Sequence, residues 1–600
     1  MKKFVAKLLP LAMCLGLLAA CAAEEQKPTL GPITLEDGNS TQSSESTDPP
    51  APEEPFVYYW VRSGEETSMN PHQANATSDS DVLAKMQASL YTYLPAKDGM
   101  SARLVPDLAA SEPVSEDGVV WHIAIDPAAK WENGEPINAA SFVYSYKMQL
   151  DPLLVYQTGS LLAVDFISIK NAQAYYLQGN SNSVAWEDVG IRAAGEYLLE
   201  IECDRPQSAI DVMRHFNLSY TAPVYEPLYS RLLSADGTVC EYGSSADKVL
   251  CSGRFRLESW TKGAEVVMVK NEQDLHGDWV QIDKIVSRLV TDESTRLELF
   301  EKGEADHVAL GTNGMAKYGE DPRVREYPSL SVESIEVNQN HPEKPWLDDP
   351  LFRKAIFYAI DRNAVAKLTN NLAAPYFLSV LGQAKADGTM YRDLPEAQAL
   401  VPANGGYDPE LAKGYFKQVL DKYGLEKLEL DLLYTESSNA RRTASEYIQS
   451  SLIALFGEDK ISLSLSAASF ANLNATMRSS VQGPVSSWDL CWSAWGVTGE
   501  KFAPWRKLER YTTWHSRRYT MYKNEAVDDL YADCLLEENR LDENKLVALT
   551  LQLEQAMYDD MTCVPVYAPF NYLMFSEEID LPMERYDPSV GFGWLYADRH

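Results

Sequence analysis

Four tryptophans crowd one short segment of the chain, WDLCWSAWGVTGEKFAPW, which begins at Trp488. Such a cluster of rings could stack against a ring, a sugar or a peptide backbone, or it could fill a core. We expect Trp495 to belong to a binding site, and we expect the others, Trp488, Trp492 and Trp505, to be core residues. The chemistry that this segment suggests is therefore ligand recognition.

Signatures of catalysis are missing from the sequence. It has no G-x-S-x-G elbow, no H-E-x-x-H helix and no phosphate-binding glycine loop. The 13 Trp and 33 Tyr would suit an extracellular glycoside hydrolase, but among 87 acidic residues a candidate pair of carboxylates proves nothing. We therefore expect a protein that is not an enzyme.

Metal and cofactor chemistry has no local support either. No cysteine lies in a C-x-x-C pair, and the eight histidines are scattered, so we expect no metal site and no cofactor. Cys240 and Cys251 could close a short disulfide loop, with free buried thiols as an equal alternative.

The N-terminus reads as an export signal. Lysines precede an apolar run from Leu8 to Ala20, which is too short for a membrane anchor, so residues 1–20 form a leader. The following Cys21 ends a Leu-Ala-Ala-Cys run that resembles the lipobox of bacterial lipoproteins, which implies acylation of this cysteine; an ordinary cleaved signal is the alternative. Residues 21–55, rich in Ser, Thr, Pro and Glu, form a tether without packed structure.

The net charge limits the partners. A formal charge of −34 repels nucleic acid and anionic membranes, so we expect no nucleic-acid partner and contact with the membrane only through the lipid. We expect a monomer. Its 600 residues exceed what one core usually holds, so two or three domains should follow the tether.

The folded part opens with an α/β pattern. Phe56 to Val61 is aromatic and β-branched, which predicts a strand, and the polar run after it predicts a loop. Apolar residues at helical spacing predict a helix over residues 82–94, with Asp81 as its cap.

The stretch KWENGEPINAASFVYSYKMQLDP, from Lys130, predicts a strand, a turn and a helix. Asn133-Gly134 makes the turn, and Asn138 caps a helix over residues 139–150, whose buried face carries Phe142, Tyr146 and Leu150. Because its charged residues point outward and no acid, base or nucleophile converges with another, we interpret the stretch as scaffold.

This stretch resembles the signature of extracytoplasmic solute-binding proteins of the oligopeptide and dipeptide ABC-transporter family. Further segments that resemble the family begin at Leu104, Val249, Leu297, Asp348, Tyr407, Glu446 and Trp488, so the likeness runs from about residue 56 to about 600. Among them, Gly303 should end a helix in the left-handed conformation. In the segment DDPLFRKAIFYAIDRNAVAKL, Asp349 caps a helix with Phe352 and Ile356 on its buried face.

The resemblance implies an α/β fold like that of the periplasmic binding proteins, two-lobed (type II, cluster C), with an extra small domain inserted in lobe I. Carried over to this chain, lobe I comprises residues 56–95, 215–337 and 568–600. The inserted domain is 96–214 and lobe II is 338–567. Asn338 is then a candidate hinge residue, with a plain strand end as the alternative.

The resemblance also implies a site. Trp495 and Gly496 match the family segment that holds the α-amino group of a peptide, but Thr498 stands where an aspartate is expected. Either Glu500 replaces that aspartate or the ligand amine is bound differently, since a buried ammonium without a carboxylate is costly. Three more residues are implied as ligand contacts: Tyr156, Met69 and Asn70.

We therefore expect a lipid-anchored extracytoplasmic receptor that binds oligopeptides in an interlobe cleft and delivers them to an ABC permease for uptake. A sensor of signalling peptides, or a receptor of the same fold for a sugar or metal complex, is the alternative. The sequence leaves open the Gram-positive surface and the Gram-negative periplasm.

Overall fold

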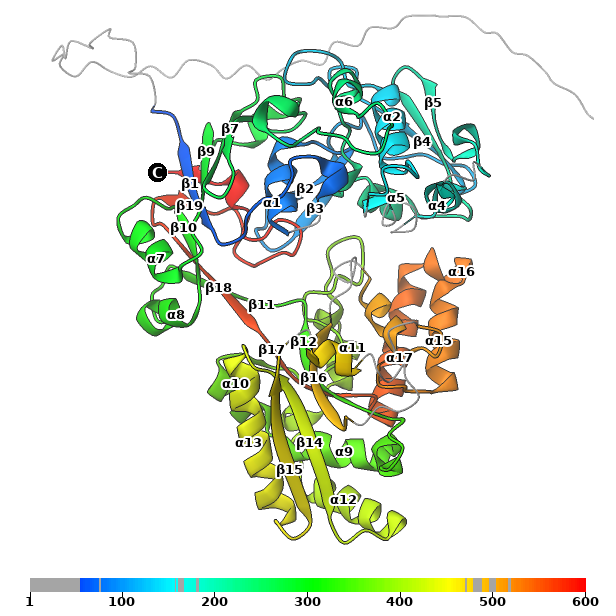
Figure 1. The fold of residues 1–600 in the computed structure, drawn as a ribbon, viewed down its shortest axis with the longest axis vertical. Coiled ribbons are helices and arrows are strands. Elements are labelled where there is room, and N and C mark those ends of the chain that lie inside the picture. The colour runs from blue at the N-terminus through cyan, green and yellow to red at the C-terminus, as the bar shows by residue number, and fades with distance from the viewer. Residues whose placement is uncertain are drawn as a thin grey trace, which may run out of the picture. The chain divides into compact units, whose positions relative to one another are not determined.

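The computed structural model describes residues 54–74, 77–156, 158–159, 167–179, 183–469, 472–477, 488–495, 503–515 and 519–600. The described chain forms a two-lobed α/β fold built on two large mixed sheets, with a smaller sheet in an inserted domain (Figure 1). Among the described helices, none is long and apolar enough to cross a membrane. The expected leader, Cys21 and the tether up to residue 53 lie outside the described residues.

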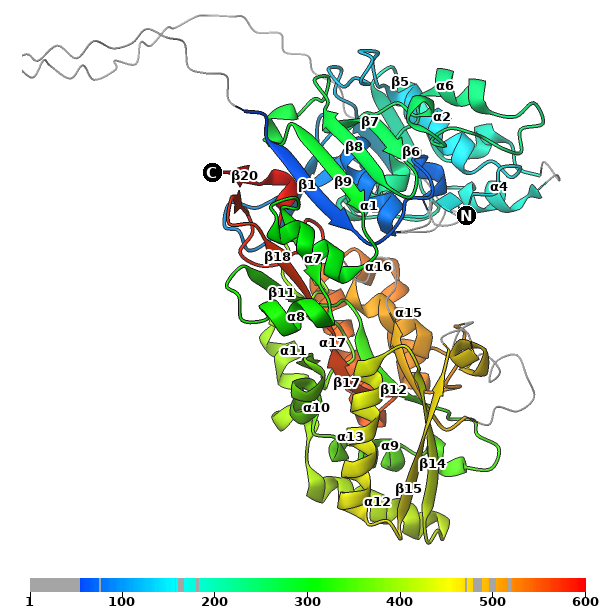
Figure 2. The same ribbon diagram turned by 60° about the vertical axis from the view of Figure 1, so that its left-hand side comes forward.

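The sheet of the first lobe has seven strands in the order β11-β18-β10-β1-β9-β8-β7. Their bounds are β1 (Val57–Arg62), β7 (Phe255–Thr261), β8 (Glu265–Lys270), β9 (Lys284–Leu289), β10 (His307–Leu310), β11 (Val324–Pro328) and β18 (Phe570–Phe575). β1 lies parallel to both β9 and β10, which confirms the strand expected at 56–61. Figure 2 shows β1 beside β9, with β8 on the other side of β9. α7 (Glu293–Glu301) leads toward β10, and Gly303 follows it at φ 72°, as expected.

The prediction of a helix over residues 82–94 is wrong at both ends. α1 spans Thr77–Met86, so Asp81 lies inside the helix and does not cap it. Tyr91–Pro95 is instead a strand, β2, which pairs antiparallel with β3 (Ala102–Pro106). Tyr and Thr favour a pleated strand, and pairing with β3 satisfies backbone groups that a lengthened α1 would have bonded internally.

The inserted domain holds the stretch that begins at Lys130. Its sheet is β4 (Val120–Ala124), β6 (Leu198–Glu202) and β5 (Ile191–Gly195), with α2 (Ala139–Gln149), α4 (Ala172–Leu177) and α5 (Ala209–His215) around it. Asn138 and Ser141 form a reciprocal capping box at the start of α2. Phe142, Tyr146 and Leu150 are fully buried, which confirms the expected helix and its scaffold role.

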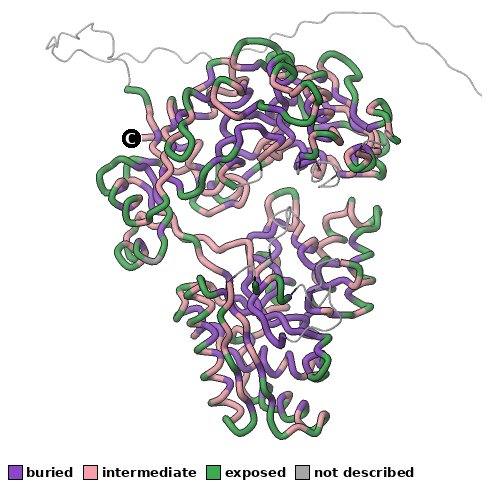
Figure 3. Tube along the Cα trace, in the orientation of Figure 1, coloured by how far each residue is buried: buried purple, intermediate pink, exposed green. Residues whose placement is uncertain are grey.

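The sheet of the second lobe has six strands in the order β13-β17-β12-β16-β14-β15. Their bounds are β12 (Val332–Val337), β13 (Leu372–Ala373), β14 (Leu428–Thr435), β15 (Ile461–Ala468), β16 (Leu490–Trp495) and β17 (Val564–Ala568). Its longer helices are α9 (Pro350–Ala359), α10 (Arg362–Thr369), α12 (Pro409–Tyr423), α13 (Asn439–Phe456), α15 (Glu525–Leu535) and α17 (Glu543–Asp560). Asp349 caps α9 as expected, and Phe352 and Ile356 are buried. Figure 3 shows buried residues gathered in the interior of this lobe.

Two neighbouring segments carry the chain between the two large sheets. β11 continues into β12, and β17 continues into β18, and the Ser329 amide donates to the Pro569 carbonyl (2.7 Å) between them. β12 is therefore a strand of the second sheet, although the sequence-based boundary after residue 337 gave it to lobe I. Asn338 follows the far end of β12, fully buried, with its side chain donating to the Trp488 carbonyl (2.9 Å). It is a plain strand end, and the crossing lies before β12.

A buried ionic cluster holds a loop of the second lobe against α17. Glu554 on α17 is fully buried and accepts from the Tyr391 hydroxyl (3.0 Å) and the Phe377 amide (3.3 Å). The Arg392 guanidinium pairs with the same carboxylate. Because the desolvated charges compensate each other, removing one of them leaves the other buried without a counter-ion.

We expect Glu554→Gln to lower the free energy of unfolding by about 3 kcal/mol, since it strands the Arg392 charge. Chemical denaturation measures the loss, with Glu537→Gln on an exposed helix face as the control. A Glu554→Gln protein as stable as that control would contradict this role for the cluster.

Candidate functional site

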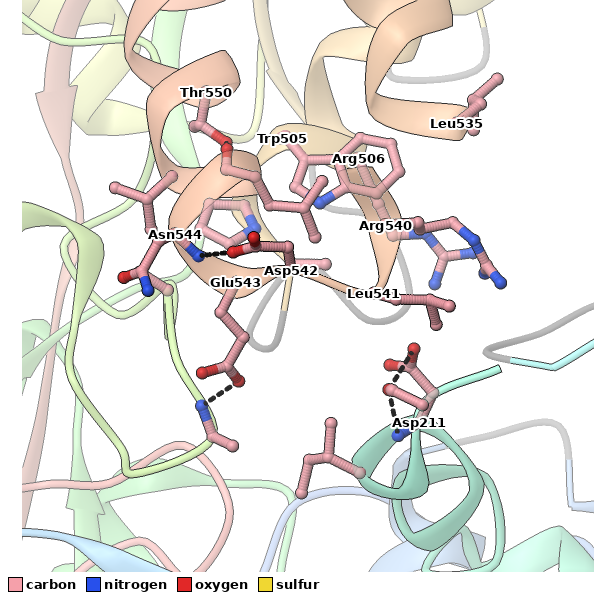
Figure 4. Close-up of a pocket in the computed structure, with 18 of the residues that line it drawn as sticks. Asp211, Trp505, Arg506, Leu535, Arg540, Leu541, Asp542, Glu543, Asn544 and Thr550 are labelled. Carbon is pink, nitrogen blue, oxygen red and sulfur yellow. Dashed lines mark hydrogen bonds between the residues drawn. The ribbon is translucent and has the colours of Figure 1, made fainter. Parts of the chain in front are cut away.

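A cavity of 740 Å³ lies between the inserted domain and the second lobe (Figure 4). We call it the interlobe cavity. The inserted domain lines it with residues from 205 to 214, and the second lobe with residues from 384 to 391, 503 to 509 and 531 to 550. The size suits a small ligand or part of a larger one.

Helix caps fix the charged walls of the interlobe cavity. Ser208 caps α5 by accepting from the Asp211 amide (3.2 Å), and its hydroxyl donates to the Asp211 carboxylate (2.8 Å). Asp542 caps α17 by accepting from the amides of its first turn, and Glu543 accepts from the Ala386 amide (2.7 Å), as Figure 4 shows. Two aromatic rings, Trp505 and Tyr531, add an apolar wall with their centroids 5.4 Å apart.

Arg540 joins the two walls. Its guanidinium, on α16 (Glu537–Arg540), donates to the Pro206 carbonyl (2.9 Å) and to the Gln207 side chain (2.8 Å) of the inserted domain. Burial lowers the pKa of Arg540, and the positive charge of Arg205 lowers it further. Four arginines and four carboxylates line the cavity, so charged groups of both signs meet where the two parts of the protein come together.

A second depression of 720 Å³, the lobe I groove, runs over the first lobe. Ser63 and Gly64 line it directly after β1, as loops after strands do in ligand-binding α/β lobes. Lys85 of α1 lies over the rings of Trp60 (4.7 Å) and Trp594 (5.0 Å), and burial lowers the pKa of its ammonium. The groove thus offers aromatic faces with a desolvated cation among them.

Met69, Asn70 and Tyr156, expected from the sequence, come together in the interior of the structure. Asn70 accepts from the His72 amide (3.0 Å), and the Tyr156 hydroxyl bonds the Tyr229 hydroxyl (3.0 Å). All of these side chains are buried, and none of the three expected residues lines the interlobe cavity or the lobe I groove. In this conformation they support the wall of the first lobe from within.

The tryptophan-rich segment is described only in part. Trp495 ends β16, where its backbone pairs with Val332, and its side chain lies outside the description together with Gly496, Thr498 and Glu500. Trp488 and Trp492 are core residues, as expected. Trp505 is buried too, but it also lines the interlobe cavity, which the sequence did not indicate.

The structure forms no bond between Cys240 and Cys251, so of the two alternatives the free thiols are the one that it shows. Each sulfur has its own surroundings. The Cys240 thiol donates to the Tyr229 carbonyl (3.7 Å), whereas Cys251 packs in the core of the first lobe beside Glu132, which accepts from its amide (2.7 Å). Burial raises the pKa of both thiols.

The charged residues of the interlobe cavity converge from three segments far apart in the sequence, and no local motif marks them. Across the described residues, His, Cys, Asp and Glu side chains nowhere form a cluster that could hold a metal ion. The described walls offer charged groups, hydrogen-bond partners and ring faces, which together suit the reversible binding of a polar ligand.

Comparison with known protein families identifies the family of this chain. Residues 103–505 match the model of the bacterial extracellular solute-binding proteins, family 5 (middle region). The chain belongs to this family. Its matched region includes the inserted domain, the crossing into the second sheet and β16.

This family 5 protein is similar to individual relatives in sequence and to solved structures in fold. The oligopeptide-binding protein OppA of Bacillus subtilis is 26% identical over 373 residues, which cover 61% of this chain and 60% of that protein. The solved structure of Listeria monocytogenes OppA bound to peptide has a TM-score of 0.61 at 21% identity, covering 91% of this chain and 99% of that one. The unliganded open form of the murein tripeptide-binding protein MppA has a TM-score of 0.70 at 19% identity, covering 88% and 95%.

Two buried histidines of the first lobe, His72 and His307, predict a pH dependence of stability. Burial lowers the pKa of His72 to about 3, and burial likewise lowers the pKa of His307 to about 3. Their unfolded values are about 6.5, so below that pH the unfolded chain binds protons that the folded chain excludes. Stability is therefore full above about pH 6.5 and is lost as the pH falls toward 3.

We expect each of these histidines to remove about 2 kcal/mol from the free energy of unfolding between pH 7.5 and pH 5. The variant His72→Gln, which cannot titrate, should show a shallower decline than the native protein, whatever its stability at neutral pH. Urea denaturation across this range measures the slope, with the exposed His600→Gln as the control. An unchanged slope in His72→Gln would show that His72 is protonated in the folded state.

Proposed function

We propose that this family 5 protein is an extracytoplasmic receptor that captures oligopeptides between its lobes and delivers them to an ABC permease. The observation that carries the proposal is the interlobe cavity, whose walls come from the inserted domain and the second lobe. A ligand that contacts both walls binds better when the lobes are closed, and mass action then shifts the population toward closure.

A peptide is the ligand class that these walls suit best. A peptide backbone carries donors and acceptors at regular intervals, its ends are charged, and its side chains vary. Charged groups of both signs and the Trp505 and Tyr531 rings can meet all three features, with water filling what a given side chain leaves empty. Relatives named as oligopeptide-binding and dipeptide-binding proteins support the same class.

We further propose that Glu500 pairs with the α-amino group of the peptide. Glu500 lies five positions after Trp495, the last residue of β16, and Thr498 has no charge to offer an ammonium group. A carboxylate two residues further on supplies the counter-charge that a desolvated ammonium needs.

The proposal also includes a lipid anchor at Cys21. This cysteine directly follows the leader, and a polar tether of some thirty residues follows it. An acylated cysteine there would keep a monomeric receptor near its permease while leaving the lobes free to close.

Native mass spectrometry of the chain, purified without refolding from a bacterium that processes lipoproteins, tests the function. We expect a ladder of co-purified masses that fragment into amino acids, on a chain that begins at an acylated Cys21. Reloading with free and N-acetylated peptides then tests Glu500. The native chain should prefer free amines, and Glu500→Gln should lose that preference, whereas the neighbouring Lys501→Gln should keep it.

Other spectra would contradict the proposal in distinct ways. A single sugar or cofactor mass would mean that the fold serves another solute. One defined peptide at full occupancy would favour a sensor of a signalling peptide. An unmodified N-terminus would overturn the lipid anchor and leave the binding function untouched.

A further inference from the structure

Arg540 makes a direct contact between the second lobe and the inserted domain at the wall of the interlobe cavity. Its guanidinium donates to the Pro206 carbonyl (2.9 Å) and to the side-chain oxygen of Gln207 (2.8 Å). The donor and its acceptors belong to parts of the protein that separate when the lobes open. The contact therefore exists only in an arrangement in which the lobes lie close together.

The acceptor end of this contact is held in place within the inserted domain. The side-chain amide of Gln207 donates to the Arg205 carbonyl (3.0 Å), which leaves its oxygen to accept from Arg540. The backbone amide of Gln207 donates to the Gly118 carbonyl (2.8 Å), and Gly118 has a φ of 72°. A Cβ atom at Gly118 would lie 3.2 Å from the Gln207 carbonyl oxygen, so glycine permits this close approach.

The donor end is held by the helices of the second lobe. The Asn539 side chain of α16 donates to the Asp533 carbonyl of α15 (3.0 Å). The Lys545 ammonium of α17 donates to the Glu538 carbonyl of α16 (3.1 Å). Because α16 is tied to both neighbouring helices, Arg540 moves with the second lobe as one body.

The contact is favourable but moderate in strength. Both acceptors are uncharged, so the guanidinium gains less than it would from a carboxylate. The Arg540 Nε is buried without an acceptor among the described groups, which costs part of that gain. Such a contact can form and break repeatedly, as a movement between two arrangements of the lobes requires.

Apolar side chains on both walls favour the same movement. Leu535 and Leu541 of the second lobe line the cavity and are 41% and 40% exposed (Figure 4). Ala209 and Ile210 of α5 line the wall of the inserted domain. Burial of exposed apolar surface is favourable, so a closer approach of the two walls stabilises the arrangement in which Arg540 is bonded.

We propose that Arg540, Pro206 and Gln207 form a latch between the second lobe and the inserted domain, so that a closed arrangement is populated before any ligand binds. The inference goes beyond the proposed function, because it concerns the closing movement and not the class of ligand. A ligand then selects an arrangement that the protein already visits, and its apparent affinity rises with the population of that arrangement.

Pulsed electron resonance on the full chain without ligand tests the latch. Spin labels are attached to Glu116→Cys of the inserted domain and Asp529→Cys of α15, two exposed positions. Partial denaturation and dialysis remove bound ligand, and native mass spectrometry verifies its removal. We expect two populations of the distance between the labels, of which the shorter is the latched arrangement.

Variants assign the shorter population to the latch. Arg540→Gln removes both bonds and should lower the ratio of the short to the long population about tenfold. Gln207→Leu keeps the bond to Pro206 and should lower the ratio less, and the double variant should match Arg540→Gln because Gln207 acts through Arg540. Arg442→Gln removes an exposed arginine that donates to the Glu436 carbonyl within the second lobe (3.4 Å), and it should keep the native ratio.

The outcomes separate the latch from the proposed function. A native protein without the short population, or an Arg540→Gln protein that keeps the native ratio, overturns the latch. Equal midpoints of urea denaturation show that the variants are folded as the native protein is. Because the distances are measured without ligand, a native protein that carries no peptide would overturn the proposed function and leave the latch standing.

Discussion

Everything in the architecture depends on the crossing where two neighbouring segments leave one sheet for the other. β11 and β18 are paired in the first sheet, and β12 and β17 are paired in the second. Only residues 329–331 and Pro569 lie between these pairings, joined by the bond from the Ser329 amide to the Pro569 carbonyl. Strand pairing on both sides is stiff, so a change of angle between the lobes is concentrated in these few residues.

This constraint also determines how the shape of the interlobe cavity can change. Its walls belong to parts of the chain that are joined through the crossing, so its shape changes with the angle between the lobes. Arg540 of the second lobe already spans the two walls by donating to Pro206 and Gln207 of the inserted domain. Deeper in the second lobe, the Glu554 cluster fixes Tyr391, whose ring lines the same cavity. A rigid wall opposite a movable one suits binding by closure.

Much of the fold could be predicted because local chemistry specifies it. Asn138 with Ser141, and Asp349 before Pro350, are caps whose roles follow from neighbouring residues alone, and the structure confirms both helices. The helix predicted over residues 82–94 includes Tyr91 to Leu94 because their apolar spacing fits both periods, and only the pairing with β3 decides between them.

The site was harder to predict, and for a physical reason. Met69, Asn70 and Tyr156 do meet in space, but in the interior, since likeness to a family gives a position in the chain and not the direction of a side chain. Arg540 contacts Pro206 and Gln207, which lie 334 and 333 positions earlier in the chain, and nothing near either segment marks this contact. Such convergence is a property of the tertiary fold, so no reading of local pattern could have found it.

The central claim is that a peptide closes the lobes around the crossing, and a distance across the lobes tests it most directly. Spin labels introduced at the exposed Lys262 and Lys413, one in each lobe, report that distance by pulsed electron resonance. The six described native cysteines are buried free thiols, which protects them from labelling. We predict a distribution that becomes shorter and narrower as captured peptide is added back. An unchanged distribution at saturating peptide would contradict the account, because binding would then occur without closure.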